Sequence, residues 1–549
     1  MSDITIFRAK KIITMNPRRP LATHVAVRDG RILGAGSLEE LTGWGDHTLD
    51  ERLADKVLMP GMIEGHSHSL EGSVWQDHYV GYFERRGPDG VTRPALRSID
   101  EVVEHLRRVE AKLSDPEAPI IAWGFDPIYF AGRRMAAADL DRVSTRRPIV
   151  VVHASFHIIN VNSLVLERAN ITASTDVMGI MKGPDGAPSG ELLGMPARFL
   201  ALGAVGRDHF EEMGKEASLR AFARSAQLAG VTTATDLANA LPAQTIENLR
   251  AVSDDPAYPL RIVPAYLGLS GPVEEGVAKM KGLVPQSSDK LRFGLIKLIA
   301  DGSIQGFTAR LKWPGYYNGS PNGLWYMDPD EIPRVIAAYH EAGLQVHIHT
   351  NGDQATEVVL DAIESVLAKS PGSDARFTLQ HCQMAHEAHY RRMARLGVCA
   401  NLFANHLYYW GDEHAAQTLG PERAERMNAA GSAKRWGVPF AIHSDAPITP
   451  LAPLFTAWCA VNRETVSGRV LGEAERITVE DALQAITLGA AYTLKLDGEL
   501  GSIETGKRAD FAVLDEDPLT VGPAALKDVP VWGTLLGGEV FPCAELVPA

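Results

Sequence analysis

Two histidines separated by one residue, His66 and His68, follow a short apolar run in the segment MPGMIEGHSH. On a β-strand, side chains at positions i and i+2 share a face, so both imidazoles could bind one metal ion. An H-x-H sequence also occurs by chance in turns, where the two histidines are simply polar surface residues. We therefore asked whether other residues of the chain suit the same metal site.

Further charged or metal-competent residues interrupt other apolar runs near their C-terminal ends. Lys297 lies in FGLIKLIADG, His349 in LQVHIHT, His381 in RFTLQHC and Asp445 in VPFAIHSD. Each of these side chains would cost a few kcal/mol if it were buried without a partner. A shared metal ion relieves that cost for the whole set. A hydrogen-bonded place in the core is the alternative for any single histidine.

Neighbouring histidines in two of these runs can be ranked by their position. His347 and His349 share a face, but His349 is nearer the C-terminal end. We therefore expect His349 to bind the metal and His347 to pack beneath it. The same alternation puts His443 on the face of Asp445, one layer deeper.

Lys297 needs a separate argument because an ammonium group has no lone pair. It can bind a metal only when it is deprotonated, or after carboxylation by CO2 to a bridging carbamate. The alternative is a buried ion pair with Asp301.

The apolar runs have the length of buried parallel strands, and helical segments such as EIPRVIAAYHEAG separate several of them. Eight such units predict a (β/α)8 barrel, in which the C-terminal strand ends carry the chemistry. The predicted strands are 57–68, 230–237, 260–267, 293–302, 344–350, 376–382, 397–404 and 438–445.

The rest of the chain predicts two additional parts. Strand-like segments in residues 1–56 and 490–549 predict a composite β-sandwich built from both termini. The barrel then covers 57–489, with an insertion at about 70–215 that is too long for an ordinary loop. We expect this insertion to form an α+β cap with a helix over 98–113 and strands near 119–127 and 147–157.

Composition narrows the range of partners. A formal net charge of -14 argues against nucleic-acid or anionic-membrane binding, because both need a basic patch. The four cysteines are far apart and predict a reducing compartment rather than a disulfide scaffold. No apolar run approaches the roughly 18 residues of a membrane span. We expect a cytoplasmic homo-oligomer, a dimer, that acts on a small molecule.

Several motifs, in this order along nearly the whole chain, resemble the amidohydrolase superfamily. They resemble its amidohydrolase-3 or YtcJ-like branch, which includes N-substituted formamide deformylase. The motifs are PGMIEGHSH, GVTTATDL, IKLIADGS, HTNGDQA, LQHCQ, ANH, HSDAP and LGSIETGKRADFAVLDEDP. This resemblance implies a (β/α)8 barrel, a composite β-sandwich and a hydrolytic site with one or two divalent ions, Zn2+ or a similar metal.

The resemblance also implies roles for particular residues. The superfamily's metal-binding positions fall on His66, His68, Lys297, His349, His381 and Asp445, and Asp445 is also its catalytic acid–base. FHIINVNS resembles a cap segment and gives His157 and Asn162, and ANH gives a pocket histidine, His406. Two departures are Glu64-Gly65, where Asp-Ala is usual, and His443, where glycine is common before Ser-Asp.

The activity implied by the resemblance is cleavage of an amide-type C–N bond by a metal-activated water. Asp445 would shuttle the proton, and His381, His406 or His157 could polarise the carbonyl. A decarboxylase or isomerase on the same scaffold is an alternative, as is a metal-binding protein without turnover. The intact Asp445 disfavours the last, because a binder needs no base.

Aromatic residues of the cap suggest where substrate choice would arise. Trp75 and Tyr79 begin the insertion and could line an apolar or aryl pocket. The alternative is that they only pack the cap.

Overall fold

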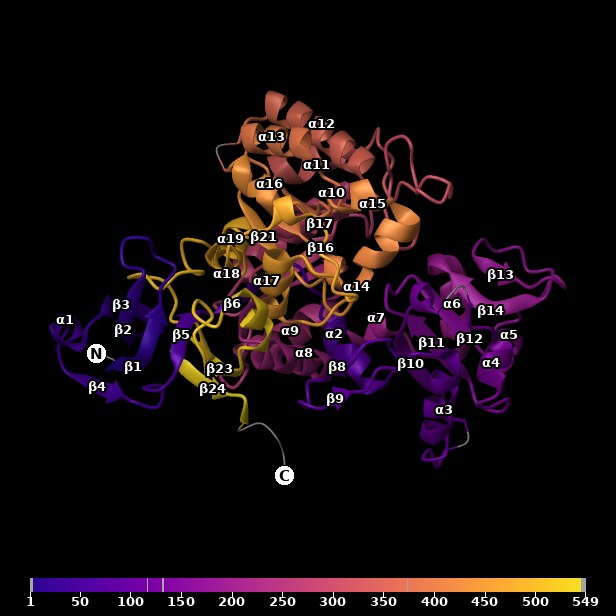
Figure 1. Ribbon diagram of the computed structural model, residues 1–549, viewed down its shortest axis with the longest axis horizontal. Helices are drawn as coiled ribbons and strands as arrows, with labels where there is room; N and C mark the ends of the chain where they lie inside the picture. The colour runs from indigo at the N-terminus through magenta and orange to yellow at the C-terminus, as the bar shows by residue number, and fades with distance from the viewer. Residues whose placement is uncertain (1–2, 116, 131–132, 373, 545–549) are drawn as a thin grey trace. The chain divides into compact units, whose positions relative to one another are not determined.

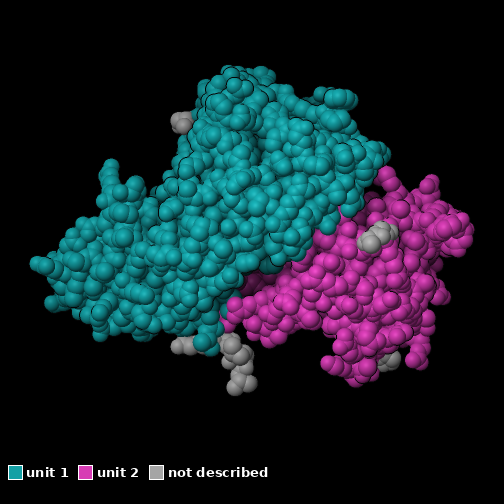
Figure 2. All heavy atoms as spheres, in the orientation of Figure 1, with its two compact units in different colours: residues 1–68, 226–549 teal, residues 69–225 magenta. Residues whose placement is uncertain are grey.

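The computed structural model describes residues 3–115, 117–130, 133–372 and 374–544. The chain divides into two compact units, residues 1–68 with 226–549, and residues 69–225 (Figure 2). Among the described residues, no helix is long and apolar enough to cross a bilayer.

An eight-stranded parallel sheet forms the centre of the larger unit (Figure 1). Its strands follow one another in space as they do in the sequence, which gives an α/β fold. In order they are β6 (Met62–Glu64), β15 (Val231–Asn239), β16 (Arg261–Leu267), β17 (Leu295–Ile299), β18 (Gln345–Thr350), β19 (Thr378–His381), β20 (Cys399–Leu402) and β21 (Phe440–Ile442).

The two edges of this sheet meet just beyond the C-terminal ends of β6 and β21. Ser67 and Ala446 form a parallel bridge. The backbone N–H of Asp445 donates to the carbonyl of His66 at 3.1 Å, and the N–H of His68 donates to the carbonyl of Ala446 at 2.9 Å. These bonds hold the segment after β6 beside the segment after β21.

Helices between the strands cover the outside of the sheet. Helices α10 to α13 lie next to one another in chain order, and α11 and α12 pack against β18 (Figure 1). Amphipathic spacing explains their packing, since α11 buries Ile332, Val335, Ile336 and Tyr339 on one face. Their bounds are α10 (Val273–Leu283), α11 (Ile332–Glu341), α12 (Asp353–Lys369) and α13 (Glu387–Leu396).

A second sheet of this unit combines strands from both ends of the chain. Its order is β24-β23-β22-β5-β1-β2-β3, with β4 also paired to β1. The structure places these strands in one sheet, and the two-layer sandwich stays a prediction. The strands are β1 (Ile4–Ile13), β2 (Leu21–Arg28), β3 (Arg31–Gly36), β4 (His47–Asp50), β5 (Val57–Pro60), β22 (Phe511–Leu514), β23 (Val531–Leu536) and β24 (Glu539–Pro542).

The predicted strand 57–68 was wrong as a single element. Residues 57–60 form β5, which pairs with β1 and β22, whereas Met62–Glu64 form β6 of the parallel sheet. Gly61 lies at the change of sheet, and its N–H donates to the carbonyl of Asp510 at 2.8 Å. A Cβ at Gly61 would lie 2.0 Å from Thr232 Oγ1, so only glycine fits this crossing.

The smaller unit is a mixed α+β body. Its six-stranded sheet has the order β13-β14-β12-β11-β10-β7, and α3 (Ile99–Glu110) packs against it through Val102, Val103 and Leu106. The helix and the two strands expected from the sequence are therefore present. The strands are β7 (His78–Tyr79), β10 (Ile120–Phe125), β11 (Ile149–His153), β12 (Ile158–Val161), β13 (Ile180–Lys182) and β14 (Pro188–Leu193).

Candidate active site

The predicted metal-site residues of the larger unit lie at or near the C-terminal ends of the parallel strands. His66 and His68 follow β6, and Asp445 follows β21. Lys297 and His349 lie within β17 and β18, and His381 ends β19. In a parallel α/β sheet this is the edge at which active sites form.

Asp445 is the residue on which the first two histidines converge. Its Oδ1 lies 3.3 Å from His66 Nε2 and 3.2 Å from His68 Nε2, and its Oδ2 lies 3.9 Å from His381 Nδ1. Burial raises the pKa of Asp445, but contact with the His68 imidazole and the nearby positive charges more than offset it. The net pKa lies below the usual value, so the carboxylate is ionised at neutral pH.

Hydrogen bonds on the far side of each ring decide which nitrogen faces Asp445. His66 Nδ1 donates to Gln380 Oε1 at 2.6 Å, and His68 Nδ1 donates to the carbonyl of Leu237 at 2.5 Å. With Nδ1 used as the donor, a ring that carries a single proton presents the lone pair of Nε2 to Asp445 Oδ1. Three lone-pair atoms facing one another are repulsive unless a cation lies among them, so this arrangement suits a metal ion.

Gln380 links this pair to a deeper histidine. Its Nε2 donates to His347 Nδ1 at 2.7 Å, and His347 Nε2 donates to the carbonyl of Thr493 at 2.8 Å. Both ring nitrogens of His347 are satisfied and the residue is fully buried. His347 thus packs beneath the site, as predicted from its position in the strand.

The backbone is strained at two of these residues. Asp445 has φ +54° and His381 has φ +72°, both in the left-handed region that non-glycine residues rarely adopt. Such conformations cost on the order of 1–3 kcal/mol and are common at functional sites, where they direct a side chain. The two residues with a strained backbone are thus Asp445 and His381, whose side chains are both part of the candidate site.

Lys297 is buried and has no hydrogen-bond partner on Nζ among the described residues. Burial lowers the pKa of Lys297 to about 7, and the charge of Asp445 opposes that shift. The predicted alternative, an ion pair with Asp301, does not form. The carboxylate of Asp301 instead accepts three backbone N–H groups at 2.8 to 2.9 Å.

His349 lies beside His381 rather than beside Asp445. Its Nε2 lies 3.2 Å from the carbonyl of Gly302 and 3.0 Å from the Asn351 amide nitrogen Nδ2, which is a hydrogen-bond donor. The ring centroids of His349 and His381 are 4.5 Å apart. His349 is outside the two groups of candidate ligand atoms at the strand ends, which are His66, His68 and Asp445, and His66, His381 and His443.

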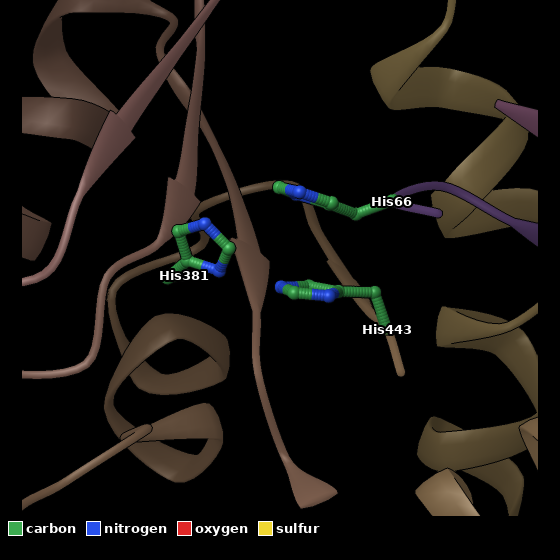
Figure 3. Close-up of side chains that lie close together, drawn as sticks. All are labelled: His66, His381 and His443. Atoms are coloured by element: carbon green, nitrogen blue, oxygen red, sulfur yellow. The ribbon is translucent and has the colours of Figure 1, made fainter. Parts of the chain in front are cut away.

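His443 belongs to the second of these groups, although its position predicted only a place one layer deeper. Its ring stacks on His66 at 4.5 Å between centroids and 17° between planes, with His381 on the side toward which both rings extend (Figure 3). Burial lowers the pKa of His443 to about 3, so the ring is neutral at neutral pH. The signal in the sequence was the histidine in a place where the superfamily commonly has glycine.

His406 is held by a chain of hydrogen bonds that the sequence did not predict. It lies in α14 (Asn405–Glu413), and its Nε2 donates to Gln305 Oε1 at 3.1 Å. Its Nδ1 must then accept the hydrogen of His414 Nε2, 2.9 Å away, and His414 Nδ1 accepts the Thr418 hydroxyl at 2.7 Å. His414 begins a π-helical turn (His414–Thr418), a feature frequent at functional sites.

Glu64 is a second residue whose role the sequence did not predict. Its carboxyl group is buried and accepts the backbone N–H of Ser444 at 3.1 Å and the Ser444 hydroxyl at 2.8 Å. Burial raises the pKa of Glu64 to about 8. Glu64 therefore joins the end of β6 to the residue that precedes Asp445.

We expect Glu64→Leu to lower the melting temperature, because it leaves two buried Ser444 donors unsatisfied at about 1–3 kcal/mol each. Glu64→Gln is the matched control, since its amide resembles the protonated acid and can still bond to Ser444. Thermal unfolding of the two variants tests this. Equal melting temperatures for the Glu64→Leu and Glu64→Gln variants would show that these hydrogen bonds contribute little to stability.

The predicted cap residues belong to the smaller unit. His157 is exposed there, and its catalytic role stays a prediction. Asn162 has a structural role, because its Oδ1 accepts the N–H of Val165 at the start of a helix and its Nδ2 donates to the carbonyls of Ser144 and Arg147.

The aromatic residues at the start of the insertion pack against one another within the smaller unit. The Trp75 ring lies 5.1 Å from that of Trp123, and Tyr79 lies 5.0 Å from Trp123. Trp75 Nε1 donates to Glu71 Oε1 at 2.8 Å, and Glu71 pairs with buried Arg85 at 2.7 Å. These contacts favour the alternative in which Trp75 and Tyr79 stabilise the cap.

A third group of metal-competent side chains lies on α12 and at the start of α13, at Glu357, His386 and His389. The rings of His386 and His389 stack at 3.7 Å between centroids, so their in-plane lone pairs do not meet at one point. Lys312 already forms an ion pair with Glu357. This group is satisfied without a metal.

Comparison with known proteins identifies the family of the chain. The sequence profile of the amidohydrolase family matches residues 53–542. The chain belongs to the amidohydrolase family. It is accordingly a metal-dependent hydrolase that acts on carbon–nitrogen bonds, as the sequence predicted.

Individual relatives cover almost the whole chain of this amidohydrolase. The putative amidohydrolase YtcJ of Bacillus subtilis is 29% identical over 550 residues, which are 96% of this chain and 97% of the relative. N-substituted formamide deformylase of Arthrobacter pascens is 27% identical over 561 residues, 98% of each chain. The crystal structure of an uncharacterized metal-dependent hydrolase from Pyrococcus horikoshii has a TM-score of 0.72 at 20% identity, covering 95% of this chain and 99% of that one.

Proposed function

We propose that this amidohydrolase cleaves the amide-type C–N bond of a small organic molecule, with Zn2+ or a similar divalent ion at the strand ends of a (β/α)8 barrel. The observation that carries the proposal is the convergence of His66 Nε2, His68 Nε2 and Asp445 Oδ1, with Nδ1 of both rings already used as a donor. A divalent ion bound there would lower the pKa of water to about 7 and polarise the substrate carbonyl.

Asp445 is the proton shuttle in this proposal. Its carboxylate is ionised, so it can accept a proton from the attacking water. The protonated Asp445 then gives the proton to the leaving nitrogen, which departs as an amine while the acyl carbon becomes a carboxylic acid. One residue thus serves as base and then as acid.

His406 is the hydrogen-bond donor to the substrate. Its Nε2 carries the hydrogen because Nδ1 accepts from His414, and Gln305 is the present acceptor of that hydrogen. A substrate carbonyl oxygen that replaces the Gln305 amide oxygen would be polarised by a neutral imidazole. His381 is the second candidate for this role, and His157 of the cap is the third.

We expect His414→Leu to lower kcat/KM about tenfold, because His406 Nδ1 then loses its donor and the tautomer with hydrogen on Nε2 is no longer favoured. His414→Gln should recover most of the activity, since a glutamine amide can place an N–H near His414 Nε2. Steady-state kinetics and 15N NMR of histidine-labelled protein report the rate and the tautomer separately. Equal kcat/KM values for the wild type and the His414→Leu variant would exclude a role of His414 in setting the His406 tautomer.

Lys297 is the candidate for a carbamate, which would supply an oxygen ligand to the metal centre. A neutral Lys297 amine adds CO2 to form the N-carboxylate and releases one proton. This reaction converts a buried nitrogen that has no hydrogen-bond partner among the described residues into a group with anionic oxygen ligands. A 13C NMR carbamate signal after exposure to 13C-bicarbonate tests this role. Its loss in Lys297→Arg would assign the signal to this residue.

We expect the purified protein to contain one to two equivalents of a transition metal per chain, because histidine-rich sites favour such ions. Chelation should abolish hydrolysis, and Zn2+ should restore it. Elemental analysis together with activity before and after chelation checks this. A metal-free protein with undiminished activity would contradict the proposal.

N-substituted formamides are the first substrates to test, because a relative that covers nearly the whole chain is a formamide deformylase. A panel of amides, formamides, esters and lactams, followed for amine and CO2 release, separates hydrolysis from the alternative of decarboxylation. Loss of an amide or formamide substrate with release of neither amine nor CO2 would instead favour an isomerase. A cytoplasmic homodimer and control of substrate choice by the cap are further expectations of this proposal.

A further inference from the structure

His443 is a buried imidazole for which the proposed mechanism has no use. The residue is fully buried, and neither ring nitrogen has a hydrogen-bond partner among the described residues. Buried polar groups in folded proteins are nearly always paired, and an unpaired one points to an ion or water that belongs there. Two neighbouring buried atoms, Lys297 Nζ and His381 Nδ1, also have no hydrogen-bond partner among the described residues.

The ring geometry excludes a single ion shared by His66 and His443. Their planes differ by only 17° and their centroids are 4.5 Å apart (Figure 3), so their in-plane lone pairs run side by side instead of meeting. The distance between the rings is comparable to the roughly 3.5–4 Å that separates the ions of two-metal sites. Stacked rings of this kind therefore suit two neighbouring ions.

The ring of His381 lies across the stacked rings of His66 and His443. Its plane is inclined by 62° to that of His443, with the centroids 5.1 Å apart. The ligand atoms of His66, His381 and His443 all lie within 4.8 Å of one another, as do those of His66, His68 and Asp445. The two groups have only His66 in common, and because His66 and His443 cannot share an ion, His381 and His443 remain as the ligands of a second, adjacent position.

We propose that His443 and His381 bind a second metal ion, beside the ion held by His66, His68 and Asp445. The inference rests on the proposed metal centre and adds His443 as a ligand of it. Because both imidazoles come from the protein, this second position does not require carboxylation of Lys297. The ring of Phe403 stacks on that of His443 at 4.9 Å and offers no ligand atom.

Titration of metal-free protein with Co2+ tests the proposal, using calorimetry for stoichiometry and visible absorption for coordination. Wild type should bind two equivalents, whereas His443→Phe should keep one and bind the second at least tenfold more weakly. Phenylalanine preserves the stack between His66 and Phe403 but has no nitrogen. His443→Gly repeats the test if the larger ring disturbs folding, and Phe403→Leu is the control that should still bind two equivalents.

The outcomes separate this inference from the proposed function. Two equivalents with unchanged affinities and absorption in His443→Phe would overturn the inference, and so would a wild type that binds one equivalent and still hydrolyses amides. A wild type that binds two equivalents, loses one in His443→Phe and hydrolyses no amide would support the second position while the proposed substrate class fails.

Discussion

Asp445→Asn should lower kcat about 10²–10⁴-fold, the range typical for loss of a positioned general base. Metal content and melting temperature should stay close to those of the wild type. The amide keeps one oxygen toward His66 and His68 but cannot take a proton from water. Steady-state kinetics with elemental analysis of the same preparation measures both quantities.

The backbone makes asparagine a well-matched substitution at this position. Asp445 has φ +54°, and asparagine tolerates the left-handed region about as well as aspartate does. A loss of activity therefore reports the missing base rather than a displaced loop. If the variant keeps most of its activity, His381 or His406 must accept the proton. If it loses its metal, Asp445 acts mainly as a ligand.

His66→Ala should lose metal as well as activity, and its loss should exceed that of any other single histidine variant. His66 is a ligand of the first position and also stacks on His443, a ligand of the second, whereas His68 is a ligand of the first position alone. The substitution also removes the ring on which His443 stacks and the donor to Gln380 Oε1. We expect no measurable turnover and less than one equivalent of bound metal.

His68→Ala is the matched comparison, since it removes one ligand and leaves the stack of His66 and His443 intact. It should retain more metal than His66→Ala under the same dialysis conditions. Metal analysis after dialysis against a series of buffered Zn2+ concentrations gives the ranking. A His66→Ala protein that holds as much metal as the wild type would remove the basis for both proposed metal positions.

The strand positions and the placement of the candidate site residues could be predicted because they depend on local sequence. Apolar runs with a charged or imidazole side chain near the end identified Lys297, His349, His381 and Asp445, and the structure places all four on parallel strands or directly after one. Alternation along a strand likewise separated His349 from His347. Both inferences need only the geometry of a β-strand and the rule that barrel chemistry lies at C-terminal strand ends.

The features that the sequence did not predict depend on contacts between segments that are far apart in the chain. Glu64 contacts Ser444, 380 residues away, and His66 contacts Gln380, 314 residues away. No pattern in either segment indicates its partner. The single strand expected over 57–68 failed for a similar reason, because the need for glycine at residue 61 comes from Thr232 in another strand.

The strand order of the sheet that joins both chain ends also constrains folding during synthesis. β5 lies between β1 and β22, and the ladder from Val57 to Pro60 pairs with Leu514 to Phe511. The ribosome makes all eight strands of the parallel sheet before it reaches residue 511, so one edge of β5 stays open until then. An open edge is a template for pairing with other chains. Nascent chains stalled before residue 511 should therefore aggregate or recruit chaperones more readily than chains stalled beyond β24.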